Sequence, residues 1–205
     1  MSWKPPGKDC GSCGLKSCGE FVMRVEEGRA RYTECPYYSS VNIINNLRPV
    51  NYTGRDITGQ KYDLVLLPLP GETSARKFIL PFRPDITEKY DIKKGDVVIG
   101  RPAGAGCPVQ HVIRVMSSDH ITGVIMGHVV GPEHARGKEV KDVKEYHMVG
   151  FEGMASVIDR RPEFGKRYYF MPGSCMMHRT HTGLVSMIIE RDYGTQIKLE
   201  DIIIV

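Results

Sequence analysis

The sequence predicts a mainly β protein: a small, α-containing, cysteine-rich module followed by an antiparallel β-barrel or sandwich. Short runs rich in β-branched residues recur from residue 62 onward, separated by Gly, Pro and Asp at intervals of roughly 8–15 residues. Four of the six cysteines lie earlier, between residues 10 and 35. Long amphipathic helices between the strands are missing, which argues against a doubly wound α/β sheet.

We expect three segments in this order. Residues 1–50 form the cysteine-rich module, residues 51–61 form a linker because turn-forming residues are dense there, and residues 62–205 form the β-rich domain. A chain of 205 residues can hold a small module and one domain of ordinary size.

The composition excludes several classes of protein. Hydrophobic residues make up 41% and charged residues 25% of the chain, as in soluble globular proteins. A net charge of +4, without a basic run, does not indicate nucleic-acid binding. No apolar stretch is long enough to span a membrane, and the start of the sequence has no signal-like apolar core. We therefore expect a cytoplasmic protein, whose thiols stay reduced.

The cysteine-rich module has the ligands of a metal centre. Its four cysteines follow the spacing C-x2-C-x4-C-x16-C, and a proline follows the last one. Thiolates select zinc, copper(I) or iron–sulfur clusters, and nearby glycines let the backbone wrap closely around the sulfur atoms. Four cysteines without a histidine, closed by Cys-Pro, favour a [4Fe-4S] cluster. The proposed ligands are Cys10, Cys13, Cys18 and Cys35.

Two other interpretations of these cysteines stay open. A zinc ribbon usually has two Cys-x2-Cys knuckles, and here only Cys10 and Cys13 have that spacing. Disulfides would require an oxidising compartment.

The same stretch resembles the four-cysteine iron–sulfur domain at the start of the large (gamma) subunit of the corrinoid iron–sulfur protein and of acetyl-CoA decarbonylase/synthase. A similar module occurs in the B subunit of the Rnf electron-transport complex. The shared pattern is Lys-Asp-Cys-Gly-x-Cys-Gly, a third cysteine, a short helix and a closing Cys-Pro, found here between Lys8 and Pro36. The resemblance implies that all four cysteines bind one [4Fe-4S] cluster. It covers about the first 40 residues, so it implies the cofactor rather than the activity.

Two helices are expected in this first segment. Residues 19–27 place Phe21, Val22 and Val25 on one face, which should cover the metal centre, and Gly28 should end the helix. A second short helix is expected over residues 41–47.

The β-rich segment contains a series of candidate strands. They cover residues 62–67, 77–80, 96–100, 110–116, 121–130, 146–158, 167–171, 184–191, 196–199 and 202–205. Asp192, Tyr193 and Gly194 should form the turn of a final hairpin. Residues 131–143 read as an inserted loop or short helix.

Two loops of this segment carry reactive groups. Residues 101–111 contain Gly104, Gly106, Cys107 and His111, which could form a tight turn or let the backbone approach an anion or a flat cofactor. Residues 172–183 contain a thiol, two imidazoles, a guanidinium and three hydroxyls. Arg179, with Thr180 or Thr182, could bind a phosphate or carboxylate.

These loops supply the remaining candidate site residues. The catalytic candidates are His178, Arg179 and His181. A second metal site could be formed by Cys107, His111, Cys175 and His178 if the two loops meet. A flavin could bind at the same place, and a polar connection without a ligand is the plain alternative.

The leading hypothesis is a cytoplasmic [4Fe-4S] electron-transfer protein with a redox partner protein, no nucleic-acid partner and no membrane span. The resemblance implies an anaerobic, archaeal setting in one-carbon metabolism, with a corrinoid protein as a candidate partner. A first alternative is an iron–sulfur oxidoreductase that binds a small anion or a flavin between the two loops, and it requires both loops at one pocket. A second is a non-catalytic module held together by its metal.

Overall fold

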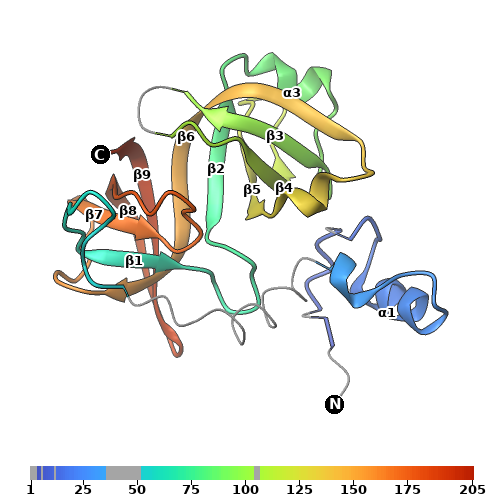
Figure 1. Ribbon diagram of the computed structural model, residues 1–205, viewed down its shortest axis with the longest axis horizontal. Coiled ribbons are helices and arrows are strands. Elements are labelled where there is room, and N and C mark those ends of the chain that lie inside the picture. The colour runs from blue at the N-terminus through green and yellow to red at the C-terminus, as the bar shows by residue number, and fades with distance from the viewer. Residues whose placement is uncertain (1–3, 6, 12, 36–51, 104–106) are drawn as a thin grey trace.

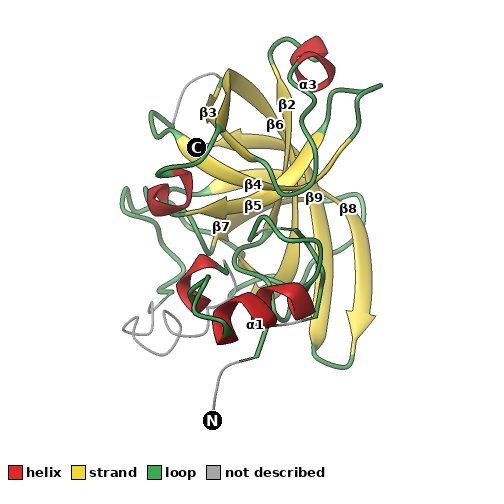
Figure 2. Ribbon diagram, turned by 90° about the vertical axis from the view of Figure 1, so that its right-hand side faces the viewer, coloured by secondary structure: helices red, strands yellow, loops and turns green. Residues whose placement is uncertain are grey.

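The computed structural model describes residues 4–5, 7–11, 13–35, 52–103 and 107–205, and it confirms a mainly β architecture (Figures 1 and 2). The predicted helix over residues 41–47 lies outside the described residues, as do Pro36, Gly104 and Gly106.

Nine strands occur in the described part of the chain, and they fall on the predicted runs. They are β1 Leu64–Leu67, β2 Arg76–Pro81, β3 Val97–Pro102, β4 His111–Ser118, β5 Ile125–Val130, β6 Val140–Val157, β7 Arg167–Pro172, β8 His181–Arg191 and β9 Gly194–Ile204. The last two predicted runs form one strand, β9, and β6 begins at Val140, within a segment expected to be irregular. β8 and β9 form the expected final hairpin.

The strands form one sheet that closes on itself twice. The strand order is β1-β7-β8-β9-β6-β2-β5-β4-β3, and β6 also pairs with β1 and with β3. We call the closed set β1, β7, β8, β9 and β6 the first ring, and the closed set β6, β2, β5, β4 and β3 the second ring. The 18-residue strand β6 belongs to both, and Figure 1 shows it running between them.

Each ring encloses its own hydrophobic core. The core of the first ring comprises Leu64, Leu66, Ala75, Phe151, Tyr168, Phe170, Val185, Ile197 and Leu199. The core of the second comprises Ile79, Ile92, Val98, Ile113, Val115, Ile125, Val143 and Tyr146. Met148 on β6 packs against both cores, so the two rings are in direct contact through this shared strand.

The strand pairing is largely antiparallel, as predicted, with two parallel pairs. β1 pairs with β7 in parallel, and β3 pairs with β6 in parallel. Each parallel pair joins strands far apart in the sequence and belongs to one of the closures. Parallel neighbours need long connections, and these connections are supplied by the other strands of the sheet.

Glycines on β6 allow neighbouring strands to approach closely. A Cβ atom at Gly153 would collide with the carbonyl oxygen of Leu67 on β1, and one at Gly150 would collide with that of Leu199 on β9. Both glycines lie where β6 contributes to the first ring, so they permit its closure.

Short helical segments complete the described chain. The helix α1, Cys18–Glu26, matches the predicted helix to within one residue, and Gly28 adopts the left-handed conformation expected after a helix end. The helix α3, Asp85–Lys89, was not predicted. Two 3-10 turns, η1 Tyr32–Glu34 and η2 Pro132–Ala135, are also present. None of the described helices combines the length and apolar character needed to cross a membrane.

The cysteine module, residues 7–35 as described, lies beside the second ring (Figures 1 and 2). Lys8 Nζ donates a hydrogen bond to Glu72 Oε1 at 3.2 Å, and Lys94 Nζ donates one to the carbonyl oxygen of Asp9 at 2.6 Å. The backbones of Gly11 and Gly95 meet so closely that a Cβ on Gly95 would strike the Gly11 carbonyl oxygen.

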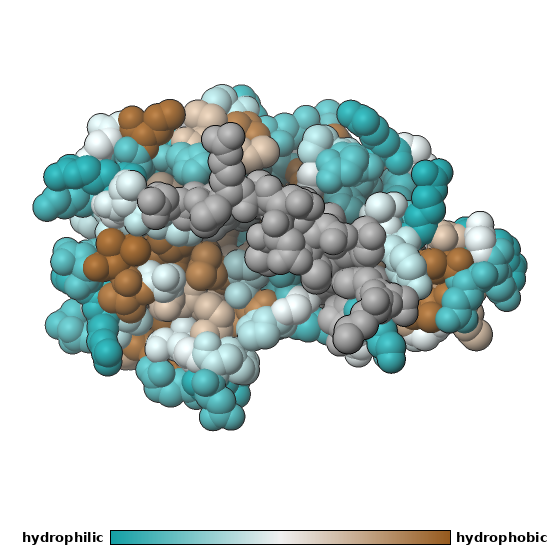
Figure 3. All heavy atoms as spheres, turned by 60° about the horizontal axis from the view of Figure 1, so that its bottom comes forward, coloured by the Kyte–Doolittle hydropathy of each residue, from teal (hydrophilic) through white to brown (hydrophobic). Residues whose placement is uncertain are grey.

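Figure 3 shows a separate cluster of apolar residues on the surface of the first ring.

Candidate functional site

The four cysteines of the module surround one cavity, which we call the thiol cavity. It has a volume of about 280 Å³ and is lined by Pro5, Cys10, Gly11, Cys13, Leu15, Ser17, Cys18, Phe21 and Cys35. No disulfide joins any of the six cysteines of the chain, all of which are described. The spacing in the sequence has therefore brought the four thiols to one place, as the cluster prediction requires.

Local hydrogen bonds fix the loop that presents these thiols. Asp9 has a positive φ and its carboxylate accepts the backbone N–H of Cys18 at 2.7 Å, which ties the first ligand loop to the start of α1. Ser17 caps α1 by accepting the N–H of Glu20. Gly11 and Gly14 both have positive φ and form a turn closed by an N–H···O=C bond of 2.9 Å.

The helix α1 covers the thiol cavity with an apolar face. Phe21 is 1% exposed and lines the cavity, and Val25 packs beside it with Leu15, Ala30 and Tyr32. Val22 does not join this cluster. Burial raises the pKa of the Cys13 thiol, so a metal must displace a tightly held proton there.

A cation from the second ring faces the thiols. Arg114 on β4 is 2% exposed, and its Nη1 donates to the carbonyl oxygen of Gly95 at 3.1 Å. Its Nε and Nη2 have no hydrogen-bond partner among the described residues. Burial lowers the pKa of Arg114, and the charges of Cys10, Cys13, Asp96 and Cys35 oppose that shift. A buried guanidinium with two idle donors fits a site built for a negatively charged group.

These residues fit an iron–sulfur cluster. The donor set consists of thiols, the cavity is covered by an aromatic side chain, and a buried cation interacts electrostatically with Cys10, Cys13 and Cys35. Among the described residues, no three His, Cys, Asp or Glu side chains converge closely enough to hold a single metal ion.

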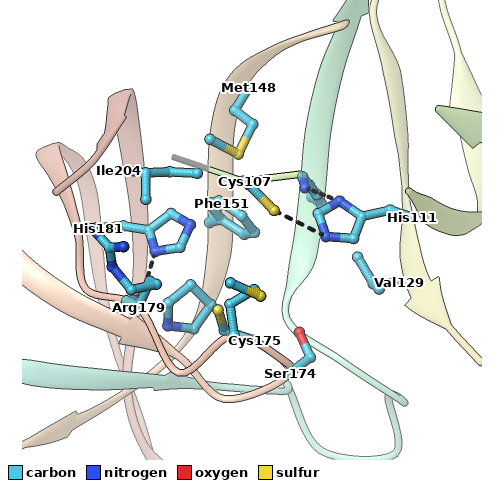
Figure 4. Close-up of a pocket in the computed structure, with 13 residues that line it drawn as sticks. Cys107, His111, Val129, Met148, Phe151, Ser174, Cys175, Arg179, His181 and Ile204 are labelled. Carbon is cyan, nitrogen blue, oxygen red and sulfur yellow. Dashed lines mark hydrogen bonds between the residues drawn. The ribbon is translucent and has the colours of Figure 1, made fainter. Parts of the chain in front are cut away.

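A second cavity lies at the junction of the two rings, and we call it the junction cavity. It has a volume of about 430 Å³ and combines side chains of β2, β4, β5 and β6 with the loop before β8 and the end of β9 (Figure 4). Its lining residues are Lys77, Cys107, His111, Val129, Met148, Phe151, Pro172, Ser174, Cys175, Met177, Arg179, His181 and Ile204. The two reactive loops of the sequence therefore meet at one pocket.

Three polar groups on one side of the junction cavity contact one another. Lys77 Nζ donates to the Tyr146 hydroxyl at 2.9 Å and lies 2.9 Å from His111 Nδ1. The Tyr146 hydroxyl lies 2.5 Å from the same nitrogen. Since both neighbours can donate, Nδ1 is the acceptor and Nε2 carries the proton. That nitrogen lies 4.0 Å from Cys107 Sγ.

Burial sets the protonation of these groups. It lowers the pKa of Lys77 to about 7, an effect that the charges of Cys107 and Cys175 partly oppose. It lowers the pKa of His111 to about 3 and that of His181 to about 4. Burial also raises the pKa of Tyr146 well above its usual range. At neutral pH the cavity therefore presents two neutral imidazoles and an amine near its midpoint, and the buried phenol of Tyr146 lies protonated behind the amine.

The sequence-predicted catalytic candidates divide between two places. Arg179 and His181 line the junction cavity, with His181 opposite His111 in Figure 4. His178 has a positive φ and instead lines a surface hollow with Tyr52 and Ile57. The structure does not bring Cys107, His111, Cys175 and His178 together as a second metal site.

The predicted anion-binding combination of Arg179 with a threonine does not form. Arg179 Nε and Nη2 donate to the main-chain oxygen of Val205, the last residue of the sequence, at 3.1 and 2.5 Å. The backbone N–H of Thr180 donates to Asp56, and the Thr182 hydroxyl accepts from Arg167. Asp56, expected within a linker, thereby ties residues 52–61 to the first ring.

Four important side chains lie inside strands and escaped the sequence reasoning. They are Lys77, Arg114, Tyr146 and Phe151. One signal was available for Lys77: in β2 the buried positions alternate, so Lys77 shares the inward face with Ile79 and Pro81. A lysine in phase with the apolar face of a strand indicates a buried amine.

A buried ionic network joins the module to the strands beside it. Glu72 accepts hydrogen bonds from Lys8 and Arg76 and contacts His128 Nε2 at 3.1 Å. Burial alone would raise the pKa of Glu72, but hydrogen bonds from His128 and Arg76 lower it to about 2. This carboxylate therefore stays charged at neutral pH.

Comparisons with known proteins support the metal centre and extend over most of the chain. A family model described as "Putative Fe-S cluster" matches residues 6–37, so the module is an iron–sulfur domain. A curated protein of Methanocaldococcus jannaschii, "Uncharacterized protein MJ0119", is 32% identical over 200 residues. The match covers 89% of this chain and 84% of that protein. No solved structure matches the chain significantly.

Proposed function

This chain belongs to the same protein family as the M. jannaschii protein MJ0119, and from that premise we propose a [4Fe-4S] electron-transfer function. The observation that carries the proposal is the thiol cavity, which gathers Cys10, Cys13, Cys18 and Cys35 around one space under α1. When bound there, a [4Fe-4S] cluster supplies one-electron redox chemistry.

The spacing of the cysteines supports a cluster over a single zinc ion. A zinc ribbon usually has two Cys-x2-Cys knuckles. Here only Cys10 and Cys13 have that spacing, and all four thiols line one cavity.

The protein's own residues insulate the site and balance its charge. Phe21 excludes water from one side, and Arg114 places a buried positive charge near the thiolates. Burial and nearby charge both tune the potential of an iron–sulfur centre.

The decisive experiment measures iron and acid-labile sulfide per chain, with EPR spectra, on protein purified without air. We expect about four irons and four sulfides and a signal on reduction. Cys18→Ala should abolish the visible absorbance, whereas Cys107→Ala, in the other cavity, should retain it. Zinc without sulfide would refute the redox function and leave a module that the metal merely holds together.

The proposed setting is the cytoplasm of an anaerobic archaeon, with a redox partner protein. The archaeal relative and the resemblance of the Lys8–Pro36 stretch to corrinoid iron–sulfur proteins support it. A corrinoid protein is the first partner to test. Mixing the reduced protein with a purified corrinoid protein should reduce the cobalt centre, which absorbance follows. No transfer at any concentration would exclude this partner.

A second candidate function is favoured by the junction cavity: an iron–sulfur oxidoreductase that binds a small anion or a flavin there. The observation behind it is that residues of both reactive loops line one cavity. A flavin would be released on denaturation as a yellow, fluorescent chromophore. If protein with its full iron content releases no coloured compound on denaturation, a flavin is excluded and a small anion remains as the candidate ligand.

A further inference from the structure

The amine of Lys77 is placed as a nucleophile. It is 2% exposed, it lines the junction cavity, and its Nζ contacts His111 Nδ1 and the Tyr146 hydroxyl, both at 2.9 Å. Among the described residues Lys77 forms no ion pair, and no carboxylate lines the cavity. An ammonium group here would thus lack a counter-ion, which favours the neutral amine.

The walls of the cavity indicate the kind of molecule that fits. Apolar side chains form most of the lining, including Val129, Met148, Phe151 and Ile204. The cavity has a neighbouring surface hollow, and Cys107, Met177 and Arg179 line both.

A cation stands across the cavity from the amine. Arg179 reaches the lining with a guanidinium whose Nε and Nη2 donate to the main-chain oxygen of Val205, the last residue of the sequence, and whose Nη1 makes no hydrogen bond to the described residues. Nη1 therefore remains available to donate to the carboxylate of a ligand. The site therefore offers a nucleophile for a carbonyl group and a cation for an acid group.

We propose that the junction cavity binds small 2-oxo acids and that Lys77 captures their carbonyl group as an imine. This inference deepens the second candidate function, because it names the substrate class of that cavity, and it does not depend on the metal in the thiol cavity.

The reaction balances without any further reagent. Nζ attacks the carbonyl carbon, a C–N bond forms, and the carbonyl oxygen takes a proton that the amine gives up. The C–O bond of this carbinolamine then breaks, the oxygen leaves as water, and loss of the second amine proton leaves a C=N bond. The net change is amine plus ketone to imine plus water.

Two neighbours of Lys77 can assist these steps. The Tyr146 hydroxyl stays protonated and lies against Nζ, where it can donate to the departing oxygen. His111 Nδ1 contacts both groups, and because its pKa is about 3 it orients them as a hydrogen-bond acceptor rather than acting as a base. Lys77 is thus the catalytic residue, with Tyr146 as a proton donor and His111 as a positioning residue.

The test is reductive trapping on the intact, cluster-loaded protein. The protein is incubated with pyruvate at pH 7, treated with borohydride, digested and mapped by mass spectrometry. Roughly half of the Lys77 amines are neutral at this pH, against fewer than about one in a thousand exposed lysines. We expect the Lys77 peptide to be labelled at least about tenfold faster than any other lysine peptide.

Controls separate the site from general lysine reactivity. Lys77→Met keeps the apolar volume of the side chain and should abolish the fast adduct. Lys198 is a partly buried lysine on β9 that forms an ion pair with Glu200, and Lys198→Met should leave the adduct at Lys77 unchanged. Propanal, which lacks the carboxylate, should label Lys77 severalfold more slowly than pyruvate. In Arg179→Gln that preference should disappear.

Several results would overturn the proposal. They are an unlabelled Lys77 in the wild-type map, labelling spread evenly over surface lysines, or equal rates with propanal and pyruvate. The wild-type map decides the first two even if a variant does not fold. Iron and sulfide content, measured on the same sample, reports separately on the electron-transfer function.

Discussion

At the scale of single residues, each cavity has a buried basic group beside it whose pKa is lowered by burial. Arg114 keeps two guanidinium nitrogens without a partner in the described chain, and Lys77 keeps an amine without a counter-ion. Such groups are costly in a protein interior unless a ligand or cofactor balances them. Their placement beside cavities explains why the fold tolerates them.

Arg114 should raise the reduction potential of the metal centre. Reduction adds a negative charge, which a nearby cation stabilises, so Arg114→Gln should lower the midpoint potential. The expected shift is on the order of 60 mV, equivalent to roughly 1.4 kcal/mol for one electron. Arg114→Lys should recover part of it. Redox titration followed by EPR measures the shift, and an unchanged potential in Arg114→Gln would show that this cation does not sense the cluster.

The imidazoles of the junction cavity should make the protein sensitive to acid. His181 has a pKa of about 4 in the folded protein and about 6.5 when unfolded, so the unfolded chain binds more protons between these values. Stability should therefore be lost as the pH falls from about 6.5 to 4, by on the order of a few kcal/mol. His181→Phe, which keeps the ring contacts with Phe151 and Phe170, should flatten this dependence. Urea unfolding at several pH values measures it, and an equal slope in the variant would assign the acid sensitivity elsewhere.

At the scale of elements, β6 is the decisive piece of the sheet. Its N-terminal part pairs with β2 and β3, and its C-terminal part pairs with β9 and β1. The alternation of residues predicted the strands themselves, because period-two burial is a local property. It could not predict the closures, because pairing between β1 and β7, or between β3 and β6, depends on contacts between distant parts of the sequence.

Gly153 should be essential to the closure of the first ring. A Cβ at this position meets the backbone of β1, which cannot move away without breaking the β1–β6 ladder. Gly153→Ala should therefore destabilise the protein by roughly 2–3 kcal/mol. Gly19→Ala is the matched control, because its Cβ has room on α1 and alanine favours a helix. Thermal unfolding compares the two, and a neutral Gly153→Ala would mean that the strands can separate there.

At the scale of the whole molecule, the two cavities differ in how far the sequence revealed them. The cysteine ligands lie within 26 residues, from Cys10 to Cys35, so local spacing was enough to predict their meeting. The junction cavity was predicted only in part, through its loops. Lys77, Met148 and Phe151 come from strand interiors, where a lysine or a phenylalanine looks like any other inward residue until the rings are assembled. The proposed domain boundaries stay a prediction.

Removing the metal should unfold the cysteine module and spare the sheet. The core of the module consists of Cys10, Phe21 and Cys35 with a few partly buried neighbours, whereas each ring has a core of its own. A module this small depends on its metal for stability. After chelation of the iron, we expect hydrogen exchange to become fast across α1 while the strands keep their protection. Loss of protection in β4 or β8 would contradict this independence.

The position of β6 in both rings also fixes an order of events during synthesis. As the chain leaves the ribosome, every strand of the second ring is available once β6 has emerged, while the first ring still lacks β7, β8 and β9. The second ring can therefore fold first and offer the far half of β6 as a template on which the later strands assemble. The junction cavity, with walls from Lys77 on β2 to Ile204 on β9, can exist only after the final strand has docked. A nascent chain would thus form its small-molecule cavity last, after all of its strands have folded.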